Sequence, residues 1–464
     1  MEQVKNFHIA PERIQQLNDR PLRHDGDYVI YWMQESMRAY ENPALEYAVR
    51  WANDLDKACI VVFTLIDDFP EANLRHYTFL LEGLKEVADR LAERDLRFVL
   101  LHGPRVDKIT AFAADAACAV VTDRAYLRHE RAWRSGAAEK LDIPLVQVEG
   151  DLVVPLETAS DKREYAARTI RRQIMERVDD FAGEVSESKP KHESKRLHVR
   201  NDLEFGTVDG LLEQLKIDRS VPPSPDFTGG TRAARKRLTA FLRSGLDGYA
   251  DGRRDPVADA TSHMSPYLHF GHISPCEILR KVRGASAPRE DIDAYVEELI
   301  VRRELAHNFV YYTPDDYDSL KALPDWASET LEKHKSDDRP DHYTREQLEN
   351  GETADEAWNA SMREMRVRGF LPNYMRMYWG KQIIRWTNTP DYAHKTALYL
   401  NNKYFLGGRD PNSFTNILWL FGLHDRAWTE REVFGKVRML SKGGLESKFD
   451  VKAYIERVEG LGEG

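Results

Sequence analysis

Three tryptophans in the C-terminal half have a spacing that suits single-electron chemistry. Trp379 and Trp386 are seven residues apart in a stretch that predicts a helix, so both rings share one face about 10.5 Å apart along the axis. Trp358 opens the helix predicted before it. Tryptophans at helical spacing usually belong to a core. Beside a redox cofactor, the same spacing would suit electron hops from the surface to that cofactor.

Two further groups could hold or protonate a ligand. Ser265 followed by Pro266 predicts a helix with Ser265 as its N-cap, where free N–H groups and the helix dipole attract anions such as a cofactor diphosphate. Glu298 is predicted to share a helix face with Arg302 and Leu305, where a carboxyl group can donate a hydrogen bond or a proton. An ordinary capped helix and a surface ion pair are the alternatives.

The remaining reactive residue types are less informative. Gly407 and Gly408 would let the backbone approach a flat ligand closely, or would simply form a loop. The three cysteines, Cys59, Cys118 and Cys276, have neither the spacing of metal ligands nor that of a disulfide framework. We therefore predict no metal site and a reducing, cytoplasmic environment, which the absence of an apolar signal stretch after Met1 also favours.

The elements that must position these residues fall into two kinds. Short apolar segments alternate with amphipathic helices such as Tyr77–Leu91 in the first third, which predicts a doubly wound parallel sheet. No G-x-G-x-x-G motif follows the first strand, so no dinucleotide fingerprint is present. From about Thr231 the pattern is almost wholly helical. The five predicted strands are Tyr28–Trp32, Ile60–Thr64, Phe98–Leu101, Ala119–Thr122 and Leu145–Val148.

These patterns divide the chain of 464 residues into four parts. We predict an N-terminal extension (1–24), an α/β domain (25–155), an interdomain linker (156–230) and a helical domain (231–464). The net charge of −10 does not by itself indicate a nucleic-acid-binding protein. Two stretches are locally basic, however: residues 162–200 hold eleven Lys or Arg against seven Asp or Glu, and residues 426–452 hold seven against four.

Several motifs occur together in the order found in one family. The chain resembles class II cyclobutane pyrimidine dimer photolyases, of the photolyase/cryptochrome family, over nearly its whole length from about residue 25. The fold implied is an α/β antenna-type domain with a five-stranded sheet, followed by an all-α domain that binds FAD. The motifs are Trp32-Met33, Ala159–Ala167, Tyr267–Gly271, Val301–Glu304, Tyr374–Trp379, Gly435–Arg438 and Lys448–Ile455.

The resemblance implies roles for residues around the cofactor. Asn401 would face flavin N5, and Arg376 would lie beside the isoalloxazine ring. Trp379, Trp358 and Trp386 would form the electron-transfer triad, in order from the flavin outward. The implied FAD contacts are Tyr249, Ser262, His263, Met264, Ser265, Glu298, Arg376, Trp379, Asn401, Gly407, Gly408 and Asn412.

The resemblance also implies a substrate and a mechanism. Blue light would excite fully reduced flavin (FADH⁻), which would donate an electron to a flipped pyrimidine dimer in DNA, split its two cyclobutane bonds and recover the electron. The sequence itself indicates no obligate protein partner, and we take a monomer as the default expectation. The implied DNA and lesion contacts are Glu298 and Met377 on the dimer, Trp419 against its bases, Arg253 and Arg254 on the lesion or the backbone, and Arg426 and Arg438 on the DNA face.

The sequence departs from this class near the flavin and the lesion. Gly407 stands where class II enzymes usually have Asp, which removes a carboxylate that could pair with Arg376. The segments 413–419 and 371–373 also differ from the usual pattern. A cryptochrome-like photoreceptor and a (6-4) photolyase, for which His263 and His269 would be available, are the alternatives.

The antenna is left open by the sequence. The α/β domain could hold a deazaflavin, a folate or no second chromophore. The segment Asp161–Arg172 could line such an antenna cavity or could contact DNA.

Overall fold

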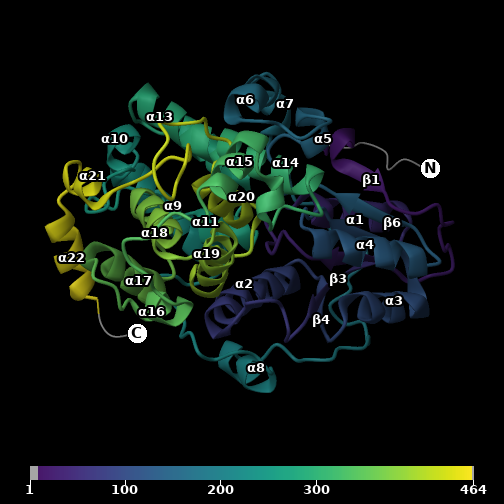
Figure 1. Ribbon diagram of the computed structural model, residues 1–464. Helices are drawn as coiled ribbons and strands as arrows, with labels where there is room; N and C mark the ends of the chain where they lie inside the picture. The colour runs from purple at the N-terminus through teal and green to yellow at the C-terminus, as the bar shows by residue number, and fades with distance from the viewer. Residues whose placement is uncertain (1–8, 462–464) are drawn as a thin grey trace.

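The computed structural model describes residues 9–461 of the chain, and it begins with a twisted sheet (Figure 1). The strand order is β1-β6-β5-β2-β3-β4, with five parallel strands and one antiparallel edge strand. The five strands predicted from the sequence are all present. Their bounds, with that of the edge strand, are β1 Ile14–Gln16, β2 Tyr28–Met33, β3 Ala58–Leu65, β4 Arg97–His102, β5 Ala117–Asp123 and β6 Leu145–Val148.

The sheet is doubly wound because both of its faces are apolar. In β2, Val29 and Tyr31 belong to the hydrophobic cluster that also contains Leu45 of α1, whereas Ile30 faces the cluster that contains Ile109 of α3. Every residue of β2 and β3 is buried, as expected for strands covered by helices on both sides. The covering helices are α1 Pro43–Asp54, α2 Leu74–Glu93, α3 Arg105–Ala116 and α4 Arg128–Lys140.

The edge strand β1 was not predicted, and it lies in the part of the chain that we expected to be an extension. Ile14 pairs with Val148 and Gln16 with Val146, antiparallel to β6. A three-residue strand carries no period-2 pattern long enough to recognise, so its formation depends on the free edge of β6. Residues 1–8 of the predicted extension lie outside the described part.

The segment predicted as a linker carries three short helices, runs along the α/β domain and then forms a fourth helix. The hydroxyl group of Ser194 donates to the carbonyl oxygen of Cys59 in β3 (2.5 Å), and the side chain of Asn201 accepts from the backbone N–H of Leu100 in β4 (2.8 Å). The helices are α5 Leu156–Ala159, α6 Ala167–Met175, α7 Val178–Phe181 and α8 Val208–Gln214.

The remainder of the described chain is helical, as predicted. One long stretch is regular except for a π-helical turn at Glu297–Arg302, between α13 and α14. The elements are α9 Thr231–Ser244, α10 Tyr249–Gly252, α11 Ser265–His269, α12 Pro275–Arg283, α13 Arg289–Val296, α14 Arg303–Tyr312, α15 Asp325–Lys333, α16 Arg345–Asn350, α17 Glu356–Arg368, α18 Asn373–Trp386, α19 Pro390–Tyr404, α20 Pro411–Leu420, α21 Lys442–Glu446 and α22 Val451–Glu459.

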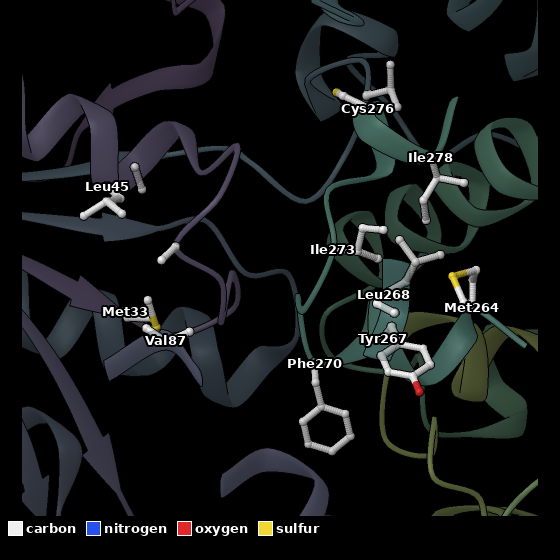
Figure 2. Close-up of a cluster of buried hydrophobic side chains, with 14 of the residues drawn as sticks. Met33, Leu45, Val87, Met264, Tyr267, Leu268, Phe270, Ile273, Cys276 and Ile278 are labelled. Carbon is white, nitrogen blue, oxygen red and sulfur yellow. The ribbon is translucent and has the colours of Figure 1, made fainter. Parts of the chain in front are cut away.

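The two parts of the molecule share one hydrophobic core. Met33 and Leu45 of the α/β part lie in the same cluster as Tyr267, Leu268 and Phe270 of the helical part (Figure 2). A shared core holds the α11 segment at a fixed distance from the carboxyl ends of β2 and β3. No helix among residues 9–461 is long and apolar enough to cross a membrane.

Candidate active site

A cavity of about 220 Å³ lies inside the helical domain, where segments far apart in the sequence converge. We call it the helical cavity. Its walls come from α10, the α11 segment, the π-helical turn, α18 and the start of α20. Eight of the predicted cofactor residues line it: Tyr249, Ser262, Met264, Ser265, Glu298, Arg376, Gly407 and Asn412.

Helix starts and hydroxyl groups form the polar walls of the helical cavity. Asp410 caps α20 by accepting from the backbone N–H of Ser413 (2.8 Å). The Tyr295 hydroxyl donates to the Ser262 hydroxyl (2.9 Å). Helix α11 begins one residue earlier than predicted, because Ser265 is its first helical residue and Met264 takes the N-cap position. The cavity therefore offers hydroxyl and N–H donors suited to an anionic group.

Arg376 is a cation of the helical cavity that forms no ion pair with any residue from 9 to 461. Its guanidinium lies over the Phe405 ring, 4.0 Å from the centroid, and its Nε has no hydrogen-bond partner among the described residues. Burial lowers the pKa of Arg376 to about 10, against the opposing influence of Asp410. A half-buried cation whose buried Nε–H is unused is costly alone and favours an anionic or acceptor-rich ligand. The donor set of this cavity thus fits a flavin nucleotide.

Gly407 lies on the same cavity, where the sequence departs from the class II pattern. A Cβ atom there would stand 3.8 Å from Ser265 and Pro266, which is ordinary contact. Its φ is not in the left-handed region, so glycine is not required at this position. The wall at Gly407 therefore has room for a Cβ atom.

Glu298 lies in the π-helical turn, and its ion-pair partner comes from another segment of the chain. Its carboxylate pairs with Arg253 (2.6 Å), whereas Arg302 donates to Glu297 (3.0 Å). The alternative of an ion pair between Glu298 and Arg302 is not what forms, because a π-helical turn shifts the side chains round the axis. Arg302 instead lies over the Trp419 ring, 5.5 Å from its centroid.

Four predicted cofactor residues do not line the helical cavity. Asn401 is buried behind it, and its amide nitrogen donates to the Asn402 side chain (3.0 Å). Gly408 packs so closely that a Cβ atom would lie 2.9 Å from the carbonyl oxygen of Asn401. His263 pairs with Asp259 (2.9 Å), and Trp379 is fully buried.

The three predicted tryptophans form a continuous buried row. The indole N–H of Trp358 donates to the backbone oxygen of Trp379 (2.9 Å), and the rings of Trp358 and Trp386 lie 5.5 Å apart at 74°. The row continues to the half-buried Tyr343, whose ring is 5.3 Å from Trp386. Sequence reasoning missed Tyr343 because it stands alone in a loop, outside any helical spacing.

A second group of aromatic and cationic residues lies on the outer surface. Trp428 is 38% exposed, and the guanidinium groups of Arg426 and Arg438 lie 5.0 and 4.4 Å from its ring centroid. Sequence reasoning named both arginines and missed Trp428, although it stands in the locally basic stretch 426–452. Arg254 is exposed just after α10, and Met377 is half-buried on α18.

A smaller cavity of about 80 Å³ lies at the carboxyl ends of β2 and β3, and we call it the sheet cavity. Gln34 and Arg105 line it with buried side-chain atoms that have no partner among the described residues. Burial raises the pKa of Glu35 well above its usual range and lowers that of Arg105 to about 10. Arg409 also lines it, whereas Gly407 and Asp410 face the helical cavity, so the 407–410 loop separates the two.

Comparisons with known proteins agree with this arrangement. A family model described as DNA photolyase matches residues 29–192. A deoxyribodipyrimidine photo-lyase of Methanothermobacter thermautotrophicus is 45% identical over 455 residues, which cover 98% of this chain and 99% of the relative. The chain belongs to the DNA photolyase family. The prediction of a photolyase-family enzyme is thereby confirmed.

Two solved structures of low identity share the fold of this photolyase-family chain. An archaeal photolyase from Sulfolobus tokodaii, solved with two FAD molecules, has a TM-score of 0.69 at 18% identity, covering 92% of this chain and 89% of that one. A cryptochrome from Synechocystis has a TM-score of 0.72 at 16% identity, covering 95% and 91%. The fold is therefore common to photolyases and cryptochromes, and it confirms the predicted α/β and helical parts.

Proposed function

We propose that this chain is a class II-like photolyase that repairs cyclobutane pyrimidine dimers in DNA with blue light. The observation that carries the proposal is that the helical cavity occurs in one helical domain with a buried row of tryptophans and with a surface group of arginines around Trp428. A repair enzyme needs both groups, because the tryptophan row would supply electrons and the surface group would hold the lesion. A cryptochrome-like photoreceptor would need only the first.

FAD is the cofactor proposed for the helical cavity. When bound in its reduced form, it supplies a light-driven electron to the lesion. Arg376 would face its negatively charged part with the unused Nε–H, and Ser262 and Ser265 would offer hydroxyl donors. The Asn402 side chain accepts a hydrogen bond from the side-chain amide nitrogen of Asn401, which fixes the direction of the Asn401 side-chain oxygen Oδ1. These residues bind and orient the cofactor.

The tryptophan row is proposed to carry electrons inward when the cofactor must be reduced. The Trp358 indole is fixed by its hydrogen bond to the Trp379 backbone, so the rings keep their spacing. All three tryptophans are at most 4% exposed, which keeps water away from most of the path. Tyr343 stands between Trp386 and solvent.

The outer surface is proposed to bind the damaged duplex. A dimer must leave the base stack to reach the cavity, and its weakened pairing lowers that cost. Glu298, held by Arg253 at the cavity wall, would accept or donate a hydrogen bond to the flipped bases. Arg254, Arg426 and Arg438 would contact phosphates, so binding should weaken steeply with salt.

The sheet cavity is the proposed place for an antenna chromophore. The amide of Gln34 and the Nε–H of Arg105 are unused polar groups in an otherwise largely apolar lining, which suits a flat heteroaromatic ring. A deazaflavin, a folate or a second flavin would each use such groups. The archaeal photolyase from Sulfolobus tokodaii was itself solved with two FAD molecules.

A (6-4) photolyase is disfavoured by where the two available histidines lie. His269 lines the sheet cavity, and burial lowers its pKa to about 4. His263 is turned toward Asp259. Neither lines the helical cavity, where a (6-4) lesion would need a proton donor.

The test is repair by the purified FAD-loaded protein. It is reduced in light, mixed with an oligonucleotide that holds one thymine dimer, and illuminated with blue light. We expect the dimer to be converted to thymines, with no reaction in the dark. Photoreduction without loss of the dimer would support the photoreceptor alternative. Repair of an oligonucleotide with a (6-4) lesion, and not of the thymine dimer, would support the (6-4) photolyase alternative.

A further inference from the structure

The segment Asp161–Arg172, which sequence analysis left between two roles, lies away from the sheet cavity. No residue from 161 to 172 lines that cavity. Helix α6 packs instead on the π-helical turn that carries Glu298, and in Figure 1 it lies on the same side as α13 and α14. The antenna role is therefore the weaker of the two for this segment.

Hydrogen bonds to the helical domain fix the backbone of this segment. The backbone N–H of Glu164 donates to the Asn308 side chain (2.7 Å), whose amide nitrogen donates to the carbonyl oxygen of Lys162 (2.9 Å). The His424 ring donates to the carbonyl oxygen of Tyr165 (2.7 Å). His424 is close in sequence to Arg426 of the proposed DNA surface. The segment is thus rigid and continuous with that surface.

Helix α6 turns one face inward and leaves two arginines outside. Ile170 and Ile174 are buried, and Arg171 forms a two-point ion pair with Glu297 (2.9 and 2.7 Å), the neighbour of Glu298. Arg168 and Arg172 are four residues apart and share the exposed face. The Arg172 side chain is 84% exposed and pairs only with Glu176 on its own helix.

We propose that Lys162, Tyr165, Arg168 and Arg172 form a second phosphate-binding strip, which contacts the backbone of duplex DNA beside the flipped dimer. This rests on the proposed function, because it extends the same DNA surface. Three cations and a 52%-exposed tyrosine on a rigid base suit a phosphodiester backbone. Because the chain as a whole carries a net charge of −10, a local surplus of positive charge on this segment points to an anionic partner.

The test measures DNA affinity of the FAD-loaded protein by fluorescence anisotropy at several salt concentrations, on damaged and undamaged duplexes. For the double variant Arg168→Gln/Arg172→Gln, we expect weaker binding to both duplexes. The slope of log affinity against log salt should fall in magnitude by about 2, one unit per lost phosphate contact. Glu176→Gln, which frees Arg172, should bind DNA more tightly, a gain that misfolding cannot produce.

Arg196→Gln is the matched control. Its side chain is 85% exposed and pairs with Glu193 three residues away, but it lies on the linker along the α/β domain. We expect its salt slope to equal that of the unchanged protein. Flavin absorbance and the thermal midpoint report folding in every variant.

Three outcomes would overturn the strip. The double variant could match Arg196→Gln in slope and affinity, lose affinity for the damaged duplex alone, or change the spectrum of a bound antenna instead of DNA binding. Failure of the proposed function has a different signature: the unchanged protein would bind DNA with a steep salt slope and leave the dimer unrepaired in blue light.

Discussion

The molecule uses tryptophan in two regions with opposite surroundings. In the row Trp379–Trp358–Trp386 the rings are buried, those of Trp358 and Trp386 are in contact, and no guanidinium lies over any of the three among the described residues. On the outer surface, Trp419 and Trp428 are each covered by arginine. Under the proposed function, electron supply and lesion binding would reside in these two separate groups. Substitutions should therefore remove one activity and leave the other.

The strongest separation is expected from Trp379→Phe. Phenylalanine keeps the packing but is much harder to oxidise than an indole, so nearly all light-driven reduction of the bound flavin should be lost. Repair by enzyme that was reduced chemically should stay close to normal. Flavin absorbance under blue light and dimer loss from an oligonucleotide measure the two activities.

Trp51→Phe is the matched control for this prediction. Trp51 is a partly buried tryptophan of α1 in the α/β domain, where it packs on Tyr47 of the same helix, and its loss should affect neither activity. Normal photoreduction by Trp379→Phe would show that the row is only part of the core.

The opposite separation is expected from Trp428→Ala. Loss of the exposed ring removes a stacking surface for bases and releases Arg426 and Arg438 from their fixed positions. A base–aromatic stack is worth about 1–3 kcal/mol, so DNA affinity should fall by roughly 5- to 150-fold while photoreduction is unchanged. Trp428→Phe, which keeps a ring, should retain most of the affinity in the same binding titration. Slower photoreduction in Trp428→Ala would contradict the separation.

The sequence determined more of the first region than of the second. Fully apolar strands and helical spacing predicted the sheet and the helix of Trp379 and Trp386, because these elements depend on local patterns. The π-helical turn at Glu297–Arg302 and the strand β1 depend on partners distant in the chain. The pairing of Glu298 with Arg253 and the position of Trp428 could not be read from spacing for the same reason.

Between the two regions lies the cavity wall at Gly407, where we expect a moderate effect. Gly407→Asp would place a carboxylate on the same cavity as Arg376 and raise the pKa of that arginine above its present value of about 10. The negative charge of the carboxylate would then cancel the positive charge of Arg376 as felt by the bound flavin. The reduced, anionic flavin should become less favourable, which lowers its midpoint potential. Spectroelectrochemistry of the bound flavin measures the change.

Gly407→Asn is the neutral control of nearly the same size. A Cβ atom fits at this position, so both variants should fold. An equal shift of potential in the two variants would show that shape, and not charge, is responsible.

The smallest effect is expected at the contact that joins the two regions. Lys381 lies on α18 between Trp379 and Trp386, and its buried ammonium group donates to the carbonyl oxygen of Leu420, next to Trp419. Burial lowers the pKa of Lys381 to about 7. The unfolded chain keeps this proton up to its ordinary pKa of 10.5, so stability should rise as the pH increases from about 7 toward 10.

Lys381→Met removes this dependence on pH. Below pH 7 the unchanged protein carries a buried charge at full cost, so the variant should gain most there, offset in part by the lost hydrogen bond to Leu420. We expect its thermal midpoint to exceed that of the unchanged protein by a few degrees more at pH 6 than at pH 9. Lys452→Met, at a lysine that is 87% exposed, should show no such difference. An equal gain at both pH values would mean that packing, and not the buried ammonium group, causes the difference in thermal midpoint. Photoreduction and repair should stay normal, because Lys381 holds two helices together and belongs neither to the tryptophan row nor to the surface group around Trp428.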